Sequence, residues 1–169
     1  VLTGLGRPAP GSIEYRGENV TGMSPSELIA RGISYVPEDR LGMGLVPNLD
    51  AVENMLLKSY THPEYSHGWL IDRKAAEAKT AAVVQQYNVK LAGLSQPVRS
   101  MSGGNLQKLL LAREISEHPK LIIVVYPARG LDVGATESIH KLLTELRDQG
   151  TAILLISEDL DELIKLSDR

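Results

Sequence analysis

Three mainly apolar segments lead into residues that could carry chemistry. Residues 121–125 read LIIVV and continue as YPARGLD, residues 33–36 lead into PEDR, and residues 152–156 lead into SEDLDE. A short, unbroken apolar run such as LIIVV is typical of a central strand of a parallel sheet, which is buried on both faces. In open α/β sheets, ligands bind just beyond the carboxyl ends of such strands. We therefore expect a candidate site beyond these strand ends.

A second candidate is the stretch from Ser102 to Asn105, which reads SGGN and precedes a helix that we expect from Leu106 to about Glu117. Glycine lets the backbone approach a ligand closely. The first-turn N–H groups and the dipole of a helix favour an anion such as a phosphate. The alternative is an ordinary N-cap with a flexible lead-in, and these residues alone do not decide between the two interpretations.

The charged stretches are weaker candidates. Glu38, Asp39 and Arg40 follow one expected strand, but a solvated charged turn would have the same composition. The carboxylates at positions 158, 159, 161 and 162 follow another strand, and the helix dipole favours carboxylates in a first helical turn whatever their function. On this interpretation Glu162 lies on the solvated side of the closing helix. The four histidines show no ligand spacing, so we expect no metal site.

The composition limits the functional class. The 169 residues suit a single domain, and a net charge of −3 gives no reason to expect nucleic acid or an anionic membrane surface as a partner. The absence of cysteine excludes disulfides and thiolate metal sites and suits a reducing cytosol. The sequence contains no signal peptide, no bilayer-spanning apolar run and no G-x-x-x-x-G-K-[ST] phosphate loop. Because it starts in the middle of a pattern, we expect it to be a fragment.

The pattern of elements predicts an α/β fold with a mainly parallel sheet. We expect residues 48–117 to form an inserted helical subdomain and residues 1–47 and 118–169 to form the core. The expected strands lie at residues 12–16, 33–36, 121–125 and 152–156. We expect a first helix after a capping box at residues 24–27, a second at 51–59 and a third from the cap Asp72 to about Tyr87. Three more helices are expected: one at 106–117, one with an apolar stripe at 139–146, and a closing helix at 158–166.

The order of these motifs resembles the nucleotide-binding domain of an ABC transporter ATPase, which has a P-loop NTPase-like core. VPEDR, MSGGNLQK, PARGLDVGA and ISEDLDEL occur in the order expected for that family. More narrowly, the chain resembles the second, C-terminal ATPase domain of the tandem-domain subunits that serve simple-sugar and nucleoside importers. The resemblance covers essentially the whole chain and implies that the chain starts after the phosphate loop.

The resemblance assigns roles to individual residues. Ser102, Gly103, Gly104 and Asn105 match the ABC signature, which in the family contacts the γ-phosphate of ATP held on the phosphate loop of a partner domain. Gln107 and Lys108 continue the helix that follows it, as they do in the subgroup.

Two further positions carry family roles. Glu38 stands at the Q-loop position, where most members have the glutamine that links the nucleotide site to the membrane subunit. Asp132 matches the D-loop aspartate that crosses the dimer interface.

Three catalytic positions depart from the family pattern. Val125 stands where the Walker B aspartate supports Mg²⁺, Tyr126 where a glutamate orients water, and Glu158 where the switch-loop histidine lies. A valine has no ligand atom for a metal, and a tyrosine is a poor base at neutral pH. Loss of a positioned base typically costs about 10²–10⁴-fold in rate. We therefore predict a degenerate site in this domain, with an intact signature that completes the ATP site of a partner.

The resemblance also implies ATP and Mg²⁺ as cofactors of the assembled subunit. It implies a second ABC nucleotide-binding domain and membrane-spanning permease subunits as partners, a solute-binding protein as an indirect partner, and no nucleic acid. The implied location is cytoplasmic, peripheral on the inner face of the plasma membrane. For the isolated chain we expect no measurable ATP hydrolysis and at best weak ATP binding.

The sequence is compatible with three alternatives. One is a non-catalytic interaction and dimerisation module of the ABC type. Another is a soluble ABC ATPase outside transport, and the third is an unrelated α/β enzyme that uses the carboxylates at residues 158–162. The transported solute does not follow from the sequence.

Overall fold

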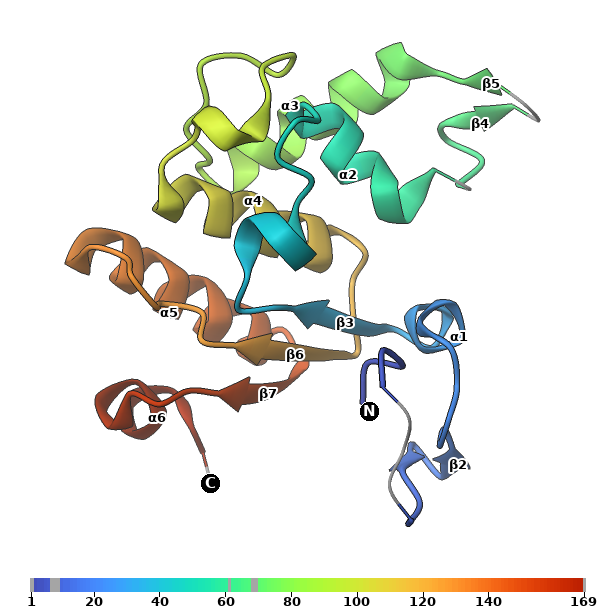
Figure 1. Ribbon diagram of the computed structural model, residues 1–169, viewed down its shortest axis with the longest axis vertical. Helices are drawn as coiled ribbons and strands as arrows, with labels where there is room; N and C mark the ends of the chain where they lie inside the picture. Colours follow the sequence, from blue (N-terminus) through green and yellow to red (C-terminus); the bar gives the residue numbers. More distant parts are fainter. Residues whose placement is uncertain (1, 7–9, 61, 68–69, 169) are drawn as a thin grey trace.

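A parallel three-stranded sheet organises the protein. The computed structural model describes residues 2–6, 10–60, 62–67 and 70–168 (Figure 1). Its main sheet has the strand order β3 (Ile33–Val36), β6 (Leu121–Val125) and β7 (Ala152–Ile156). Both strand pairs are parallel, and the bounds of all three strands are those that their apolar runs predict. The predicted α/β class is therefore confirmed in its central feature.

The register brings the carboxyl ends of the three strands together. Val36 pairs with Val124, and Val125 pairs with Ile156. The segments that follow the strands therefore leave the sheet side by side, as expected for a parallel sheet.

The side chains of β6 alternate between two apolar clusters. Ile122 and Val124 contribute to the larger cluster, together with residues of α4 (Gly103–Ser116) and α5 (Val133–Asp148). Ile123 contributes to a smaller cluster that includes Leu28 of α1 (Pro25–Ala30). Because β6 is covered on both faces, burial explains why its sequence is apolar without interruption.

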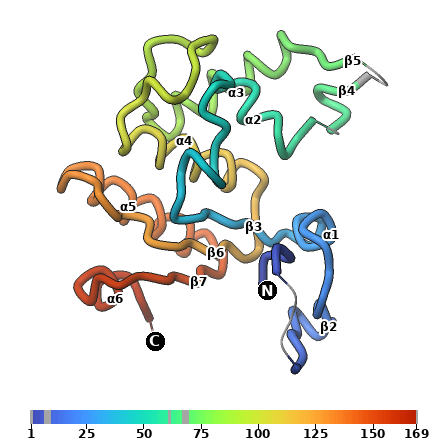
Figure 2. The backbone as a smooth tube through the Cα atoms, in the orientation of Figure 1, coloured from blue at the N-terminus to red at the C-terminus, as the bar shows by residue number. Residues whose placement is uncertain are grey.

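A group of helices lies at one end of the molecule, away from α6 (Leu160–Leu166) (Figures 1 and 2). It contains α2 (Ala51–Ser59), α3 (Arg73–Gln86) and a short antiparallel hairpin, β4 (Ser66–His67) and β5 (Leu70–Ile71). Asp50 and Asp72 accept hydrogen bonds as the N-caps of α2 and α3. Our division into an insert at 48–117 and a core remains a prediction, because α2, α3 and α4 share the larger apolar cluster with the sheet.

Several local features differ from the sequence-based expectations. Helix α4 begins at Gly103 rather than Leu106, and α6 begins at Leu160 rather than Glu158. The expected strand at 12–16 is shorter, β1 (Glu14–Tyr15), and pairs with β2 (Glu18–Asn19). A π-helical turn, η1 (Arg40–Gly44), and a 3₁₀ turn, η2 (Val98–Ser100), were not expected.

Strand β7 is less buried than its apolar sequence suggests. Leu154 and Ile156 expose 38% and 42% of their surface. Among the described strands, β7 is hydrogen-bonded to β6 alone, so it forms an edge of the sheet. Among the described residues, no helix is both long and apolar enough to cross a membrane.

Candidate functional site

Arg129 connects the residues that follow the three strands. Its guanidinium forms an ion pair with Glu38, which follows β3, and its Nε lies 3.8 Å from Oε1 of Glu158, which follows β7. Its Cζ also lies 5.6 Å from the ring centroid of Tyr126, at the end of β6. The structure therefore brings together three predicted site residues, and the side chain that joins them is one that the sequence analysis did not single out.

These ion pairs orient side chains more than they stabilise the fold. Arg129, Glu38 and Glu158 expose 54%, 45% and 66% of their side chains. Exposed ion pairs typically contribute about 0–1 kcal/mol. The cluster therefore sets the charge and shape of the strand ends, where the guanidinium is placed between two carboxylates.

Tyr126 has an unusual backbone conformation. Its φ angle is 48°, in the left-handed region that residues with a side chain rarely adopt. Its N–H donates a 2.8 Å hydrogen bond to the carbonyl of Ile156, so the turn is tied to the end of β7. The ring is held in this position beneath the guanidinium of Arg129.

The strand ends of this chain do not fit Mg²⁺. Val125 offers no ligand atom, and the two nearby carboxylates, Glu38 and Glu158, both pair with the guanidinium of Arg129. In the part of the chain that the structure describes, no group of three or more His, Cys, Asp or Glu side chains is arranged to hold a metal ion.

Arg40 joins the strand ends to the start of α4. Its Nε donates a 2.7 Å hydrogen bond to Oε1 of Gln107, and its Nη2 donates to the carbonyl of Arg129. Gln107 is 1% exposed, so this contact reaches into the interior. Burial lowers the pKa of Arg40, but an arginine remains charged at neutral pH. The position of α4 is thus coupled to the loop that carries Arg129.

The first turn of α4 is not capped by a side chain. Ser102 is the N-cap residue, but its side chain makes no capping hydrogen bond to the helix backbone. Its hydroxyl instead accepts a 2.9 Å hydrogen bond from Asn105, whose Oδ1 accepts a 2.8 Å hydrogen bond from the backbone N–H of Lys90. This arrangement leaves the first-turn N–H groups of α4 available to an anion.

The two glycines of this turn have different structural roles. A Cβ atom at Gly104 would lie 2.9 Å from Cβ of Ala135 on α5, which is closer than packed carbon atoms approach. A Cβ atom at Gly103 would lie at ordinary contact distances, 3.6 Å from Leu131 and 3.9 Å from Nη1 of Arg40. Packing within the chain thus requires glycine at position 104 but not at 103, which leaves close approach by a ligand as a reason for glycine at 103.

Alanine substitutions at these glycines are expected to separate the two roles. Gly104→Ala should destabilise the chain by about 1–3 kcal/mol, because the added methyl group forces α4 away from α5. Gly103→Ala should leave stability unchanged or slightly higher, because alanine has the higher helix propensity. Urea unfolding of both variants measures the difference, and equal losses would contradict this assignment.

Asp132 is held locally. It is the N-cap of α5, and its carboxylate accepts a 2.8 Å hydrogen bond from the N–H of Ala135. The preceding residue, Leu131, lies near Gly103, so the start of α5 and the start of α4 are adjacent. The cap explains an aspartate at this position without any partner, and its predicted role at a dimer interface stays a prediction.

Glu162 is not on a solvated side of the closing helix, which corrects our expectation. It is 4% exposed, lies 2.9 Å from Nε2 of His140 on α5, and accepts a 2.5 Å hydrogen bond from the hydroxyl of Ser157. These contacts fasten α6 and the end of β7 to α5. They therefore hold the segment that carries Glu158.

The family assignment follows from the sequence comparison. The family model described as ABC transporter matches residues 1–124, which is more than half of the chain. The chain belongs to the ABC transporter family. The family resemblance seen in the motif order is thereby confirmed at this level.

Curated relatives cover nearly all of the chain. It is 40% identical to the nucleoside import ATP-binding protein NupA of Lactococcus lactis, over 99% of the chain and 33% of the relative. It is 39% identical to the guanosine import ATP-binding protein NupO of Bacillus subtilis, with the same coverage. It is 40% identical to the ribose import ATP-binding protein RbsA 1 of Streptomyces avermitilis, over 94% of the chain and 30% of the relative. The chain thus spans about a third of the length of these relatives.

Solved structures confirm the fold of this ABC family member. A nucleotide-free ATP-binding cassette from an ABC transporter matches with a TM-score of 0.78 at 21% identity, over 99% of this chain and 67% of that chain. The ATP-binding cassette MJ0796, in a dimeric post-hydrolysis state bound to ADP and Pi, matches with a TM-score of 0.74 at 20% identity, over 95% and 68%. The α/β ABC fold with a mainly parallel sheet is therefore shown.

Proposed function

We propose that this chain is part of the ATP-binding subunit of an importer for a simple sugar or a nucleoside. In this proposal it is the second, C-terminal nucleotide-binding domain of a tandem subunit, and its own ATP site is degenerate. Its signature, Ser102 to Asn105, completes the ATP site of a second nucleotide-binding domain. The observation that carries the proposal is the contrast between the uncapped, ligand-accessible first turn of α4 and strand ends that do not fit Mg²⁺.

The names of the relatives support the class of solute. Curated proteins that match nearly the whole chain are described as nucleoside, guanosine and ribose import ATP-binding proteins. These descriptions share one function, that of the ATP-binding protein of an importer, and we propose this function for the subunit that contains this chain.

The chemistry of the strand ends supports an asymmetric pair of sites. Arg129 supplies the positive charge at the point where a working site would need a carboxylate-supported metal ion. Such a site can hold its loops in place without metal-bound nucleotide, but it cannot orient and activate water for hydrolysis. The turnover of the pair would then come from the site on the partner domain, to which this chain contributes hydrogen-bond donors for the γ-phosphate.

The proposed partners follow from this role. They are a second nucleotide-binding domain with an intact phosphate loop, membrane-spanning permease subunits, and indirectly a solute-binding protein. The subunit would bind the permease on the cytoplasmic side of the membrane. Glu38 in the Q-loop position and Asp132 in the D-loop position would contact the permease side and the dimer interface, respectively.

Restoring one catalytic carboxylate is not expected to revive the degenerate site. Tyr126→Glu in the full-length subunit should leave steady-state ATP turnover within about twofold of the original, because Val125 still offers no support for Mg²⁺ and Glu158 is not a histidine. Tyr126→Gln introduces a side chain of the same size as glutamate but without its charge, and it serves as the control. A turnover more than doubled in Tyr126→Glu, but not in Tyr126→Gln, would show that this site is catalytically competent and that the asymmetric assignment is wrong.

A further inference from the structure

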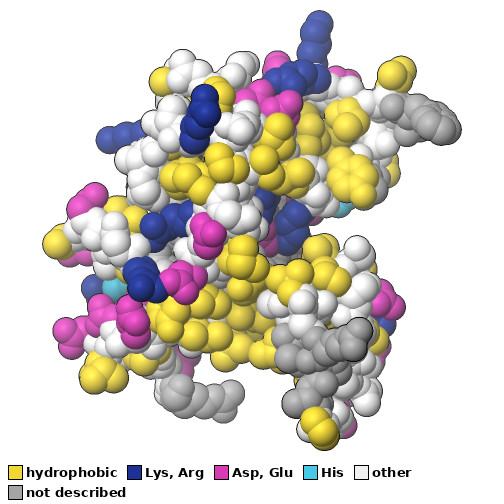
Figure 3. Space-filling view, in the orientation of Figure 1, with side chains coloured by type: hydrophobic (Ala, Val, Ile, Leu, Met, Phe, Trp, Pro, Cys, Tyr) yellow, Lys and Arg dark blue, Asp and Glu magenta, His cyan; other side chains and the backbone are white. Residues whose placement is uncertain are grey.

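A polar pocket lies between three helices, away from the strand ends. It is lined by the end of α3 and by residues of α4 and α5, and its volume is about 440 Å³. We call it the three-helix pocket. Cavities of this size commonly bind small molecules. The strand-end site is separate from it, and Figure 3 shows Lys, Arg, Asp and Glu side chains gathered beyond the strand ends, at the left of the view.

Two lysines give part of the three-helix pocket a positive charge. Lys108 of α4 is half-buried, and within the described residues its ammonium group has no hydrogen-bond or ion-pair partner. Lys141 of α5 lies 3.7 Å from Oε1 of Glu145, but both of these side chains are exposed, so their ion pair contributes little to stability. A half-buried ammonium group without a partner favours an anionic ligand, because the ligand replaces the lost hydration.

The two lysines lie toward the same end of the pocket. Helices α4 and α5 run in the same direction, because α4 leads into the start of β6 and α5 into the start of β7 (Figure 1). Gly104 and Ala135 are in close contact near the starts of the two helices. Lys108 follows Gly104 by about one turn, and Lys141 follows Ala135 by about two turns. The three-helix pocket therefore has a cationic end.

The rest of the pocket combines apolar surface with amide groups. Ile115 and Leu146 are buried side chains further along α4 and α5, and the half-buried ring of Tyr87 follows the end of α3. Three amide side chains complete this part of the lining: Gln86, Asn88 and Gln149. An amide both donates and accepts hydrogen bonds, as the edges of a nucleobase do. Apolar and aromatic surface beside amides thus fits the face and the edges of a base.

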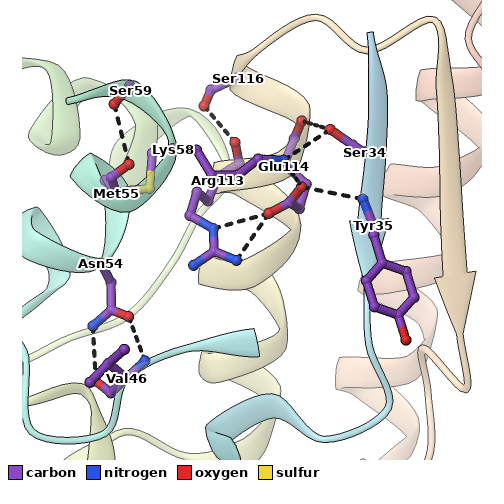
Figure 4. Close-up of polar contacts among 10 residues, drawn as sticks. All are labelled: Ser34, Tyr35, Val46, Asn54, Met55, Lys58, Ser59, Arg113, Glu114 and Ser116. Atoms are coloured by element: carbon purple, nitrogen blue, oxygen red, sulfur yellow. Dashed lines mark hydrogen bonds and ion pairs between the residues drawn. The ribbon is translucent and has the colours of Figure 1, made fainter. Parts of the chain in front are cut away.

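A different side of α4 is already held in place. The buried carboxylate of Glu114 forms an ion pair with Lys58 of α2 and lies 3.0 Å from Nη2 of the neighbouring Arg113. It also accepts a 3.4 Å hydrogen bond from the backbone N–H of Tyr35 on β3 (Figure 4). Helix α4 is therefore fastened to α2 and to the sheet, and a ligand in the three-helix pocket would add contacts from α4 to α3 and α5.

We propose that the three-helix pocket binds a nucleoside monophosphate, which lowers the ATP turnover of the subunit. The phosphate pairs with Lys108 and Lys141. The base lies against Ile115, Leu146 and the ring of Tyr87. A sugar phosphate would satisfy the cations but has no flat apolar face to cover this surface.

The regulatory part of this inference rests on the proposed function, because it assumes that α4 presents the signature to the nucleotide of a partner domain. A ligand that contacts α3, α4 and α5 at once restricts the movement of α4 relative to α5. The signature then adjusts less readily to the γ-phosphate, and turnover falls. Phosphorylation of an imported nucleoside yields a nucleoside monophosphate, so the pocket would respond to accumulation of the product of import.

Calorimetric titration of the purified full-length subunit with guanosine monophosphate tests the binding. A saturating non-hydrolysable ATP analogue keeps the ATP sites occupied. We expect saturable binding that weakens by about tenfold or more in Lys108→Gln, because the substitution removes a charge-assisted contact. Lys74→Gln makes the same change at an exposed position of α3 outside the pocket and should leave the affinity unchanged. No saturable binding, or equal affinity in Lys108→Gln and the unmodified subunit, would overturn the inference.

Two further probes test the chemical class of the ligand. Guanosine lacks the phosphate, and ribose phosphate lacks the base. Each is expected to bind at least about tenfold more weakly than guanosine monophosphate, because each loses one of the two sets of contacts. If either probe bound as tightly as guanosine monophosphate, the assignment to a nucleoside monophosphate would be wrong.

Steady-state ATP turnover of the assembled transporter tests the regulation. Saturating guanosine monophosphate is expected to lower turnover by about fivefold in the unmodified transporter and to have little effect in Lys108→Gln. Unchanged turnover in an active transporter whose pocket is saturated would overturn the regulatory inference and leave the proposed function standing. If the unmodified subunit neither hydrolyses ATP nor associates with membrane-spanning subunits, the proposed function is wrong, and the calorimetric comparison still decides whether the pocket binds the ligand.

Discussion

Gly103→Asp is expected to reduce ATP turnover of the assembled transporter by at least about 10²-fold, an effect as large as the loss of one donor to a transition-state oxyanion. The substitution places a negative charge against the γ-phosphate and adds a side chain where the backbone needs to approach it. The new carboxylate would also lie near Arg40, because a Cβ atom at position 103 is 3.9 Å from Nη1 of that residue. ATP affinity should be largely unchanged, because the partner domain holds the nucleotide. The measurement is steady-state turnover together with ATP affinity.

The control adds the same charge elsewhere. Ala78→Asp places an aspartate on an exposed position of α3, far from the signature in the sequence, and should change turnover little. Gly103→Ala controls for loss of the glycine itself, since the chain has room for that methyl group. Normal turnover in Gly103→Asp would mean that the signature contacts no nucleotide, and the non-catalytic interaction module would become the better account.

Glu114→Gln is expected to destabilise the chain by about 3–5 kcal/mol, because it leaves two buried cations without their carboxylate. The side chain is 1% exposed and holds Lys58 of α2 and the backbone of β3 as well as Arg113. Glutamine keeps the size of the side chain, so the loss reports charge and hydrogen bonding rather than a cavity. Urea unfolding followed by circular dichroism gives the free energy of unfolding.

A second glutamate near the end of α4 provides the comparison. Glu117 is 28% exposed and lies 3.5 Å from Nε2 of His62. Glu117→Gln should cost less than about 1 kcal/mol, because solvent weakens a contact between partly exposed side chains. If Glu114→Gln were as mild as Glu117→Gln, the contacts of Glu114 with Lys58 and Arg113 could not be described as a buried ionic centre.

The strands were predictable because their signal is local. The runs at 33–36, 121–125 and 152–156 are short, mainly apolar and bounded by turn residues, and the structure has strands with the same bounds. The start of α4 was not predictable in the same way. Gly103 and Gly104 have low intrinsic helix propensity, so the sequence favoured a later start. Tertiary contacts overrode that propensity, because Gly104 fits closely against Ala135.

The candidate site was predictable only in part. Glu38, Tyr126 and Glu158 each follow an expected strand of a parallel sheet, and the structure has all three at the carboxyl ends of the strands. The side chains that join them were missed, because their partners are far apart in the sequence: Arg129 and Glu38 are separated by 91 positions, and Arg40 and Gln107 by 67. No local periodicity reports such pairs. The only sequence feature that could have indicated Arg129 was its position just after a strand whose neighbouring strands are followed by carboxylates.

The exposed edge of β7 has a practical consequence for handling the protein. From Thr151 to Ser157 the sequence reads TAILLIS, which contains no charge, no proline and no glycine. In the described structure this strand is hydrogen-bonded on one side only, and two of its large apolar side chains are half-exposed. An unprotected strand of this composition is a template for pairing with further chains. We expect the described chain, purified alone and concentrated, to pair with further chains along the free edge of β7.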